Sequence, residues 1–137
     1  MSQYVTFTLG GALYGVDVLR VQEALKSHTR TRVPLAPPAV AGLVNLRGQV
    51  VLTVDLRTVL QLAPRAAGTE PMMVVVRVDG EVVSLLVDEI GDVVDAGAET
   101  FAPPPDTLEP TMRSLVVGAH KLDDRLLLVL DVDRAVA

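Results

Sequence analysis

The chain has 137 residues, of which 50% are apolar, no cysteine and a formal net charge of −5. A chain of this length forms one compact unit and excludes a multidomain enzyme. Without cysteine it has no disulfide or thiolate metal site, and a cytoplasmic location fits best. The negative charge argues against a nucleic-acid partner. The longest apolar runs have the length of strands, which predicts no direct insertion into a membrane.

Two stretches of alternating apolar and polar residues predict β-hairpins. The first runs from Tyr4 to Leu19 and turns at Gly10-Gly11, and the second runs from Met72 to Val87 and turns at Asp79-Gly80. Such residue pairs adopt the positive φ angles that two-residue hairpin turns require. The chain also has 25 valines, which favour strands throughout.

The two halves of the chain resemble one another at fixed offsets. An offset of 69 residues places the first hairpin on the second. An offset of 76 residues places Val50 to Val54 on Leu126 to Leu130, and Asp55 on Asp131. Self-similarity of this kind indicates a tandem duplication.

The duplication predicts an all-β fold with about five short strands in each copy. Antiparallel strands in that number usually close into a small barrel, so we expect two barrels that share one core. Residues 1–137 form a single domain with approximate subdomains 1–66 and 67–137, between which the termini can cross over. Pro64 to Pro71 is the expected seam between the copies.

Helix is expected only as one or two short turns. Ala36 to Gly42 and Thr58 to Leu62 are the candidates, and neither carries a long 3.6-residue pattern. The proline-rich segments Pro34 to Pro38 and Pro103 to Pro110 fall at equivalent points of the two copies. We expect them to interrupt strand pairing.

The sequence offers little catalytic or metal-binding chemistry. His28 and His120 are the only imidazoles, and neither has a partner at metal-ligand spacing. No serine lies in a nucleophile motif, and two lysines give no phosphate-binding loop. An acidic cluster lacks the spacing of a calcium loop and is expected to be a solvated strand face; it comprises Asp88, Glu89, Asp92 and Asp95. We therefore predict no cofactor, no metal and no enzymatic activity.

The segment Gly42 to Val51 is the first candidate recognition site. It predicts two strands that meet at a tight turn, where Gly48 takes a positive φ and Arg47 projects outward. An arginine fixed on a rigid hairpin can donate to carbonyls, amides or a carboxylate of a partner. The alternative is an arginine that only contacts solvent.

The segment Tyr14 to Glu23 is the second candidate. It begins as a strand, and Gly15 leaves room for the close approach of another group. Val21 and Glu23 then lie on one face, with an apolar residue beside a charged one, as at the edge of an interface. The alternative for Val21 is an ordinary core position.

Together with the flanking Phe7-Thr8-Leu9-Gly10 and Val54-Asp55-Leu56-Arg57, these two segments resemble the CheW family of bacterial chemotaxis coupling proteins. The resemblance continues through Leu86-Val87-Asp88 and Leu128 to Asp133, in the order and spacing of that family. It implies two SH3-like five-stranded β-barrel subdomains. It also implies a non-catalytic adaptor that couples methyl-accepting chemoreceptors to the histidine kinase CheA, in chemosensory arrays beneath the inner membrane.

The resemblance also implies a role for particular residues. One surface of the family holds the cytoplasmic tip of the receptor, and others hold the regulatory domain of CheA. The receptor-binding residues that match the family pattern are Val21, Glu23, Gly42, Asn45, Arg47 and Gly48. Kinase binding in the family uses exposed apolar residues of the first two strands, which correspond here to Val5 and Val18.

Other functions stay open at this point. The chain could be a CheW-like module that serves another chemosensory-type pathway or an unrelated protein partner, or a barrel that binds a small molecule or peptide. A hydrolase with an unrecognised site is a third alternative, but it needs convergent titratable groups that the sequence does not offer. A small-molecule or peptide barrel predicts that Arg47→Glu leaves the binding of protein partners unchanged.

Overall fold

The structure, a computed structural model, describes residues 2–26 and 30–136, so His28 lies outside the described residues. The strands are β1 (Ser2–Leu9), β2 (Ala12–Asp17), β3 (Val21–Lys26), β4 (Val40–Leu46), β5 (Gln49–Asp55), β6 (Met72–Val78), β7 (Glu81–Val87), β8 (Glu89–Ala96), β9 (Phe101–Ala102), β10 (Val116–Lys121) and β11 (Leu126–Leu130). The helices are α1 (Leu56–Val59), α2 (Pro110–Leu115) and α3 (Val132–Ala135), with 3₁₀ turns η1 (Val18–Arg20) and η2 (Ala98–Thr100). The all-β prediction is confirmed.

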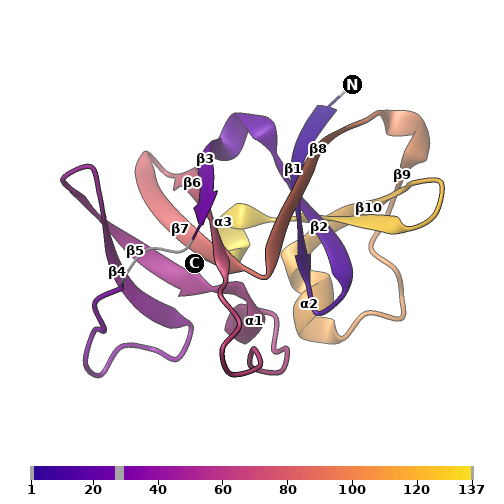
Figure 1. The fold of residues 1–137 in the computed structure, drawn as a ribbon. Coiled ribbons are helices and arrows are strands. Elements are labelled where there is room, and N and C mark those ends of the chain that lie inside the picture. The colour runs from indigo at the N-terminus through magenta and orange to yellow at the C-terminus, as the bar shows by residue number, and fades with distance from the viewer. Residues whose placement is uncertain (1, 27–29, 137) are drawn as a thin grey trace.

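The strands form two sheets (Figure 1). The six-stranded sheet has the order β8-β1-β2-β11-β10-β9, and the five-stranded sheet has the order β3-β6-β7-β5-β4. Each sheet contains one parallel pair, β11 with β2 and β5 with β7, and its other pairs are antiparallel. Figure 1 shows the five-stranded sheet on the left, the six-stranded sheet on the right and α3 between them.

Both predicted hairpins are present. β1 pairs with β2 and β6 pairs with β7, and the turn residues Gly10, Gly11, Asp79 and Gly80 all have positive φ. Positive φ at both central residues defines the tight turn whose twist matches that of the flanking strands. The first hairpin is shorter than predicted, because β2 ends at Asp17.

The predicted duplication appears as repeated elements. The hairpin β1–β2 repeats as β6–β7, and the unit β4–β5–α1 repeats as β10–β11–α3. Asp55 and Asp131 occupy the same place in the two copies, because each side chain accepts a backbone N–H at the start of the helix that follows.

The sheets divide the chain differently from the expected subdomains. β3 pairs with β6 of the second copy, and β8 pairs with β1 of the first copy. The five-stranded sheet therefore spans residues 21–87, and the six-stranded sheet combines residues 2–17 with residues 89–130. The crossing of the terminal strands, which the prediction allowed, moves the boundary away from residue 66.

The alternating residues of each strand enter different cores. Val74 and Val76 of β6 lie in a core shared by both sheets, whereas Met73 lies in a core of the five-stranded sheet. On β11, Leu128 joins the shared core and Leu127 joins a third core within the six-stranded sheet. The shared core confirms the predicted packing, and it follows from strands that are apolar on both faces.

The helices differ from the prediction. The turn expected at Thr58 to Leu62 begins earlier, because Asp55 caps α1, and no helix forms over Ala36 to Gly42. Helix α2 was not predicted, although Pro110 at its first position is a typical start signal. No helix among residues 2–26 and 30–136 has the length and apolar character to cross a membrane.

An ion-pair network lies where the chain passes from one sheet to the other. Asp88, between β7 and β8, accepts hydrogen bonds from Arg57 at 2.9 and 2.6 Å and from the Gly10 backbone N–H at 2.9 Å. Arg65 pairs with Asp88 and with Asp55, both at 3.1 Å. The expected solvated acidic face is therefore wrong for Asp88, whereas Glu89, Asp92 and Asp95 are exposed on β8.

Candidate partner-binding surfaces

The β4–β5 turn presents Arg47 as the sequence predicts. Arg47 and Gly48 both have positive φ, of 51° and 86°, and the Asn45 side chain accepts the Gly48 backbone N–H at 2.9 Å. Asparagine commonly stabilises a turn in this way. Asn45 therefore shapes the turn, and 69% of the Arg47 side chain is exposed beyond it.

The structure brings Arg47 together with Glu23. Two guanidinium nitrogens of Arg47 donate to the two carboxylate oxygens of Glu23, one at 3.1 Å. This hydrogen bond raises the pKa of Arg47 further above its ordinary value, so the charge is fixed. Glu23 lies on β3 and Arg47 follows β4, and these strands are the two edges of the five-stranded sheet. The ion pair thus joins the two edges.

We use the name hairpin site for the candidate residues Val21, Glu23, Asn45, Arg47 and Gly48. Val21 begins β3 and is half-buried against the shared core. Val21 pairs with Val76 and Glu23 pairs with Val75, with a register shift between them, so the two side chains lie on opposite faces of β3. The core interpretation of Val21 is confirmed, and the expectation that it shares a face with Glu23 is wrong. The bidentate contact occupies two of the five N–H groups of a guanidinium, which leaves donors for a partner.

Gly42 lies on β4, the strand that leads to Arg47, but it is buried and does not reach the surface. It is buried with φ of +143°, and a Cβ there would lie 2.6 Å from the Thr31 carbonyl oxygen. The backbones of Thr31 and Leu43 exchange two hydrogen bonds of 2.8 Å beside it. Gly42 allows this close approach, so the structure gives it a supporting position below the hairpin site.

The predicted kinase-binding residues are not placed as expected. Val5 is on β1, between β2 and β8, and is only 8% exposed. Val18 is not on a strand, because Asp17 accepts the Leu19 N–H at 2.9 Å and so starts η1. Both placements correct the expectation of exposed residues on the first two strands.

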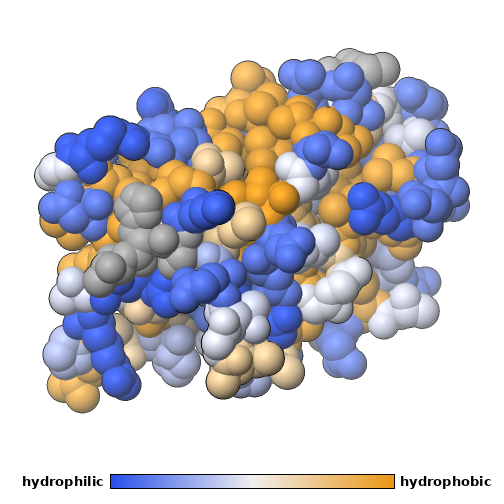
Figure 2. Space-filling model, in the orientation of Figure 1, coloured by the Kyte–Doolittle hydropathy of each residue, from blue (hydrophilic) through white to orange (hydrophobic). Residues whose placement is uncertain are grey.

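An exposed apolar surface lies directly beside these two residues. Leu19 of η1 is 88% exposed, and Val93, which pairs with Val5 from the edge strand β8, is 55% exposed. Figure 2 shows apolar surface across the upper centre of this face, over η1 and the upper parts of β1 and β8. We name this surface, consisting of Val18, Leu19 and Val93 above Val5, the apolar patch. The alternating pattern predicts that Leu19 ends a strand, so the pattern alone does not indicate its exposure.

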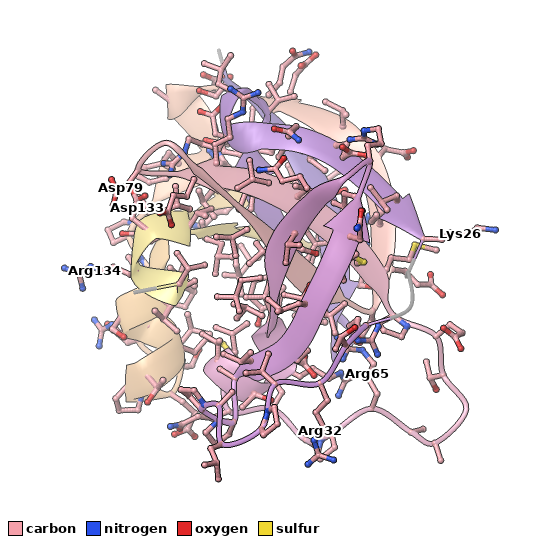
Figure 3. All side chains as sticks on the ribbon, turned by 90° about the vertical axis from the view of Figure 1, so that its left-hand side faces the viewer. Lys26, Arg32, Arg65, Asp79, Asp133 and Arg134 are labelled. Atoms are coloured by element: carbon pink, nitrogen blue, oxygen red, sulfur yellow. The ribbon has the colours of Figure 1, made fainter. Side chains whose placement is uncertain are left out.

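Arg20, the residue after Leu19 in η1, anchors the turn that carries Leu19. The Arg20 guanidinium donates to Asp133 at 2.7 Å and to the Arg77 carbonyl oxygen at 2.9 and 3.1 Å. This contact lowers the pKa of Asp133. Figure 3 shows Asp79 close to Asp133 beside α3. The apolar patch therefore has an acidic border in which Arg20 is embedded.

Comparisons with known proteins agree with this architecture. Residues 3–137 match the model of the CheW-like domain. The chemotaxis protein CheW of Klebsiella aerogenes is 30% identical over 132 residues, which cover 96% of this chain and 80% of that protein. CheW of Treponema pallidum is 29% identical over 136 residues, with the same two coverages.

A solved structure is similar over almost the whole chain. The crystal structure of the scaffolding protein TtCheW from Thermoanaerobacter tengcongensis superposes with a TM-score of 0.87 at 27% identity. The match covers 98% of this chain and 86% of that one. This chain therefore shares its overall fold with that scaffolding protein. The chain belongs to the CheW family of chemotaxis adaptor proteins.

Proposed function

We propose that this chain is a non-catalytic adaptor that couples methyl-accepting chemoreceptors to the histidine kinase CheA. It acts in the cytoplasm, within chemosensory arrays beneath the inner membrane. Membership of the CheW family supports the adaptor role. The observation that carries the proposal is the contact between Arg47 and Glu23, because it gathers residues 24 positions apart into one exposed surface.

The hairpin site is suited to the receptor tip. A helical hairpin offers apolar side chains and, at its turn, carbonyl oxygens and carboxylates. Val21 supplies an apolar edge, and Arg47 supplies oriented donors whose direction is set by Glu23 and by the rigid turn. A preorganised arginine loses little conformational entropy on binding, which favours recognition.

The apolar patch is suited to the regulatory domain of the kinase. Leu19 is a large aliphatic side chain displayed on a turn that is anchored by Asp17 and Arg20. Anchored apolar side chains that enter a pocket of the partner carry much of the energy of protein interfaces. Val5 then contributes from beneath the surface, as support for Val93.

The two surfaces are close together along the chain. Leu19 and Glu23 lie in one continuous segment of η1 and β3, four residues apart. Four residues span roughly 13 Å when fully extended, and the 3₁₀ turn at Leu19 and Arg20 makes this separation shorter. A displacement of β3 on receptor binding would therefore reach the kinase surface directly, which is what coupling requires.

The receptor contact is tested by titrating a receptor-tip fragment against three variants. Arg47→Glu should weaken binding by about tenfold or more, as for arginines central to an interface. Arg125→Glu, on the exposed β10–β11 turn, is the matched control and should bind normally. The double variant Glu23→Arg with Arg47→Glu restores an ion pair but moves the arginine from the turn to β3. Its affinity for the receptor tip should therefore stay low. Normal binding by Arg47→Glu would refute the assignment.

The kinase contact is tested in the same way with Leu19→Asp. This variant should lose affinity for the CheA regulatory domain and keep its affinity for the receptor tip. Leu35→Asp is the control, because Leu35 is also fully exposed but lies outside both surfaces. If Leu19→Asp and Leu35→Asp bind the kinase domain equally well, the apolar patch is not the kinase surface.

A further inference from the structure

His120 is the buried imidazole for which the adaptor function has no use. It lies on β10 and is only 3% exposed. Its Nε2 is 3.3 Å from the Tyr4 hydroxyl oxygen, and its Nδ1 is 2.7 Å from the Thr100 hydroxyl oxygen. The imidazole also packs between two aromatic rings, with centroids 5.3 Å from Tyr4 and 5.1 Å from Phe101.

These contacts join segments that the sheet itself does not join. Within the six-stranded sheet, β1 and β10 are separated by β2 and β11. The contact between Tyr4 and His120 therefore connects strands that are not neighbours, and it links residues 116 positions apart. Thr100 and Phe101 bring η2 and β9 to the same imidazole. One side chain thus connects β1, the second strand from one edge of the sheet, with β9 at the other edge.

The hydrogen bonds favour the tautomer of His120 that carries its proton on Nδ1. The Thr100 hydroxyl donates its only hydrogen to the Gly97 carbonyl oxygen at 3.1 Å. Its oxygen therefore accepts from Nδ1–H of His120, and Nε2 accepts from the Tyr4 hydroxyl. In this arrangement both nitrogens of a neutral imidazole are satisfied.

A second proton does not fit this arrangement. It would sit on Nε2 and point at the Tyr4 hydroxyl, whose own hydrogen would then need another acceptor. The charge would also sit on a side chain that is only 3% exposed, which is costly. Among the elements packed on the imidazole, β1 brings Tyr4, β9 brings no charge and η2 brings Glu99, whose negative charge opposes this cost. Burial outweighs Glu99, and the pKa of His120 is lowered from its ordinary 6.5.

We propose that His120 is an acid-sensitive clamp, which holds β1 and the η2–β9 segment on β10 while it is neutral and releases them when it is protonated. The folded state prefers the neutral form, so the clamp contributes fully above the pKa of the unfolded chain. This contribution is lost as the pH falls through that value toward the lower pKa of the folded chain. The six-stranded sheet should loosen first, because the strands that the clamp joins, β1, β9 and β10, all belong to it.

The first test is an NMR titration of the imidazole in the folded chain. His28→Gln removes the other imidazole, so a long-range ¹H–¹⁵N spectrum reports His120 alone. We expect the proton on Nδ1 and a pKa below 6.5. The Nε2–H tautomer, or a pKa at or above the ordinary value, would overturn the proposal.

The second test separates the clamp from other acid effects. Wild type and His120→Phe are unfolded with urea at about pH 8 and about pH 5. The carboxylates and His28 titrate in both proteins, whereas only the wild type has the imidazole of His120. His120→Gln replaces His120→Phe if the larger ring disturbs folding. We expect wild type to lose more stability on acidification than the variant. Equal losses would overturn the proposal.

The third test is local. Amide hydrogen exchange, corrected for its intrinsic dependence on pH, is compared between β1 and β9 on one side and β6 and β7 on the other. Acidification should reduce protection at β1 and β9 first in the wild type. A uniform loss across both sheets would contradict a clamp at His120.

Discussion

At the scale of single residues, Arg47 combines an unfavourable backbone with an exposed side chain. Its φ of 51° is one that asparagine and glycine adopt more easily than arginine. The turn alone would be better served by Asn-Gly, which is the preferred pair for this geometry. The arginine is therefore explained by what its side chain does at the hairpin site.

A substitution at Arg47 separates the effect of its backbone conformation from the effect of its side chain. Arg47→Asn relieves the backbone and removes only an exposed ion pair, so the urea midpoint should stay equal to that of wild type or rise. Affinity for the receptor tip should fall by about tenfold or more. A clear drop in the urea midpoint would mean that the ion pair with Glu23 stabilises the fold and that Arg47 is structural.

The residues of the hairpin site were predictable to different degrees. Gly48 and the outward position of Arg47 follow from local turn chemistry, so spacing was sufficient. The contact between Arg47 and Glu23 could not be predicted from the sequence, because it depends on how the two edge strands of one sheet approach each other. Leu19 was missed because the strand pattern continues through it, whereas the capping side chain of Asp17 ends the strand.

At the scale of elements, the close approach of neighbouring backbones depends on glycine. Gly42 of β4 lies against the Thr31 carbonyl oxygen, and the equivalent Gly118 of β10 lies against the Ala102 carbonyl oxygen. The repeat shows that both copies hold a short segment against the outer edge of this strand. Gly42 therefore shapes the edge that carries the hairpin site.

Gly42→Ala should destabilise the chain by about 1–3 kcal/mol, because its Cβ would overpack against backbone that cannot move freely. Gly68→Ala is the control, since Gly68 also has a positive φ but has open space around it. Only the backbone cost, about 1 kcal/mol, should appear there. Urea unfolding measures both, and equal losses would show that the contact with Thr31 carries no cost.

Strand existence was easier to predict than strand pairing. The hairpins β1–β2 and β6–β7 are local, and turn residues define them. The partners of β3 and β8 were not determined by pattern, because either strand is apolar enough to pair within its own copy. Packing around the shared core determines that β3 pairs with β6 and β8 pairs with β1. This packing involves residues from both copies, so the sequence of one segment does not predict it.

At the scale of the whole molecule, the Asp88 network ties the crossing point together. It connects α1, the segment before β6, the β1–β2 turn and the passage from β7 to β8. Its hydrogen bonds from Arg57 lower the pKa of Asp88 from 3.8, with further help from the Gly10 N–H. The two sheets are thus joined by charge as well as by the shared core.

Asp88→Asn should destabilise the chain by about 1–3 kcal/mol, because a neutral amide leaves Arg57 without its charged acceptor and leaves Arg65 with Asp55 alone. The loss should be present above pH 3.8 and shrink as the pH falls through the lower pKa of the folded state, where wild type is also neutral. The exposed Asp106→Asn should stay within about 0.5 kcal/mol of wild type. A loss for Asp88→Asn that persists unchanged at low pH would exclude the charge as its cause.

An adaptor must hold its two partners at the same time. The most direct test is retention of the CheA regulatory domain on immobilised receptor-tip fragments, with and without this chain. We predict that the kinase domain is retained only when the chain is present. Arg47→Glu should abolish retention while still binding the kinase domain, and Leu19→Asp should abolish it while still binding the receptor. A chain that binds each partner alone but never both together would contradict the adaptor account.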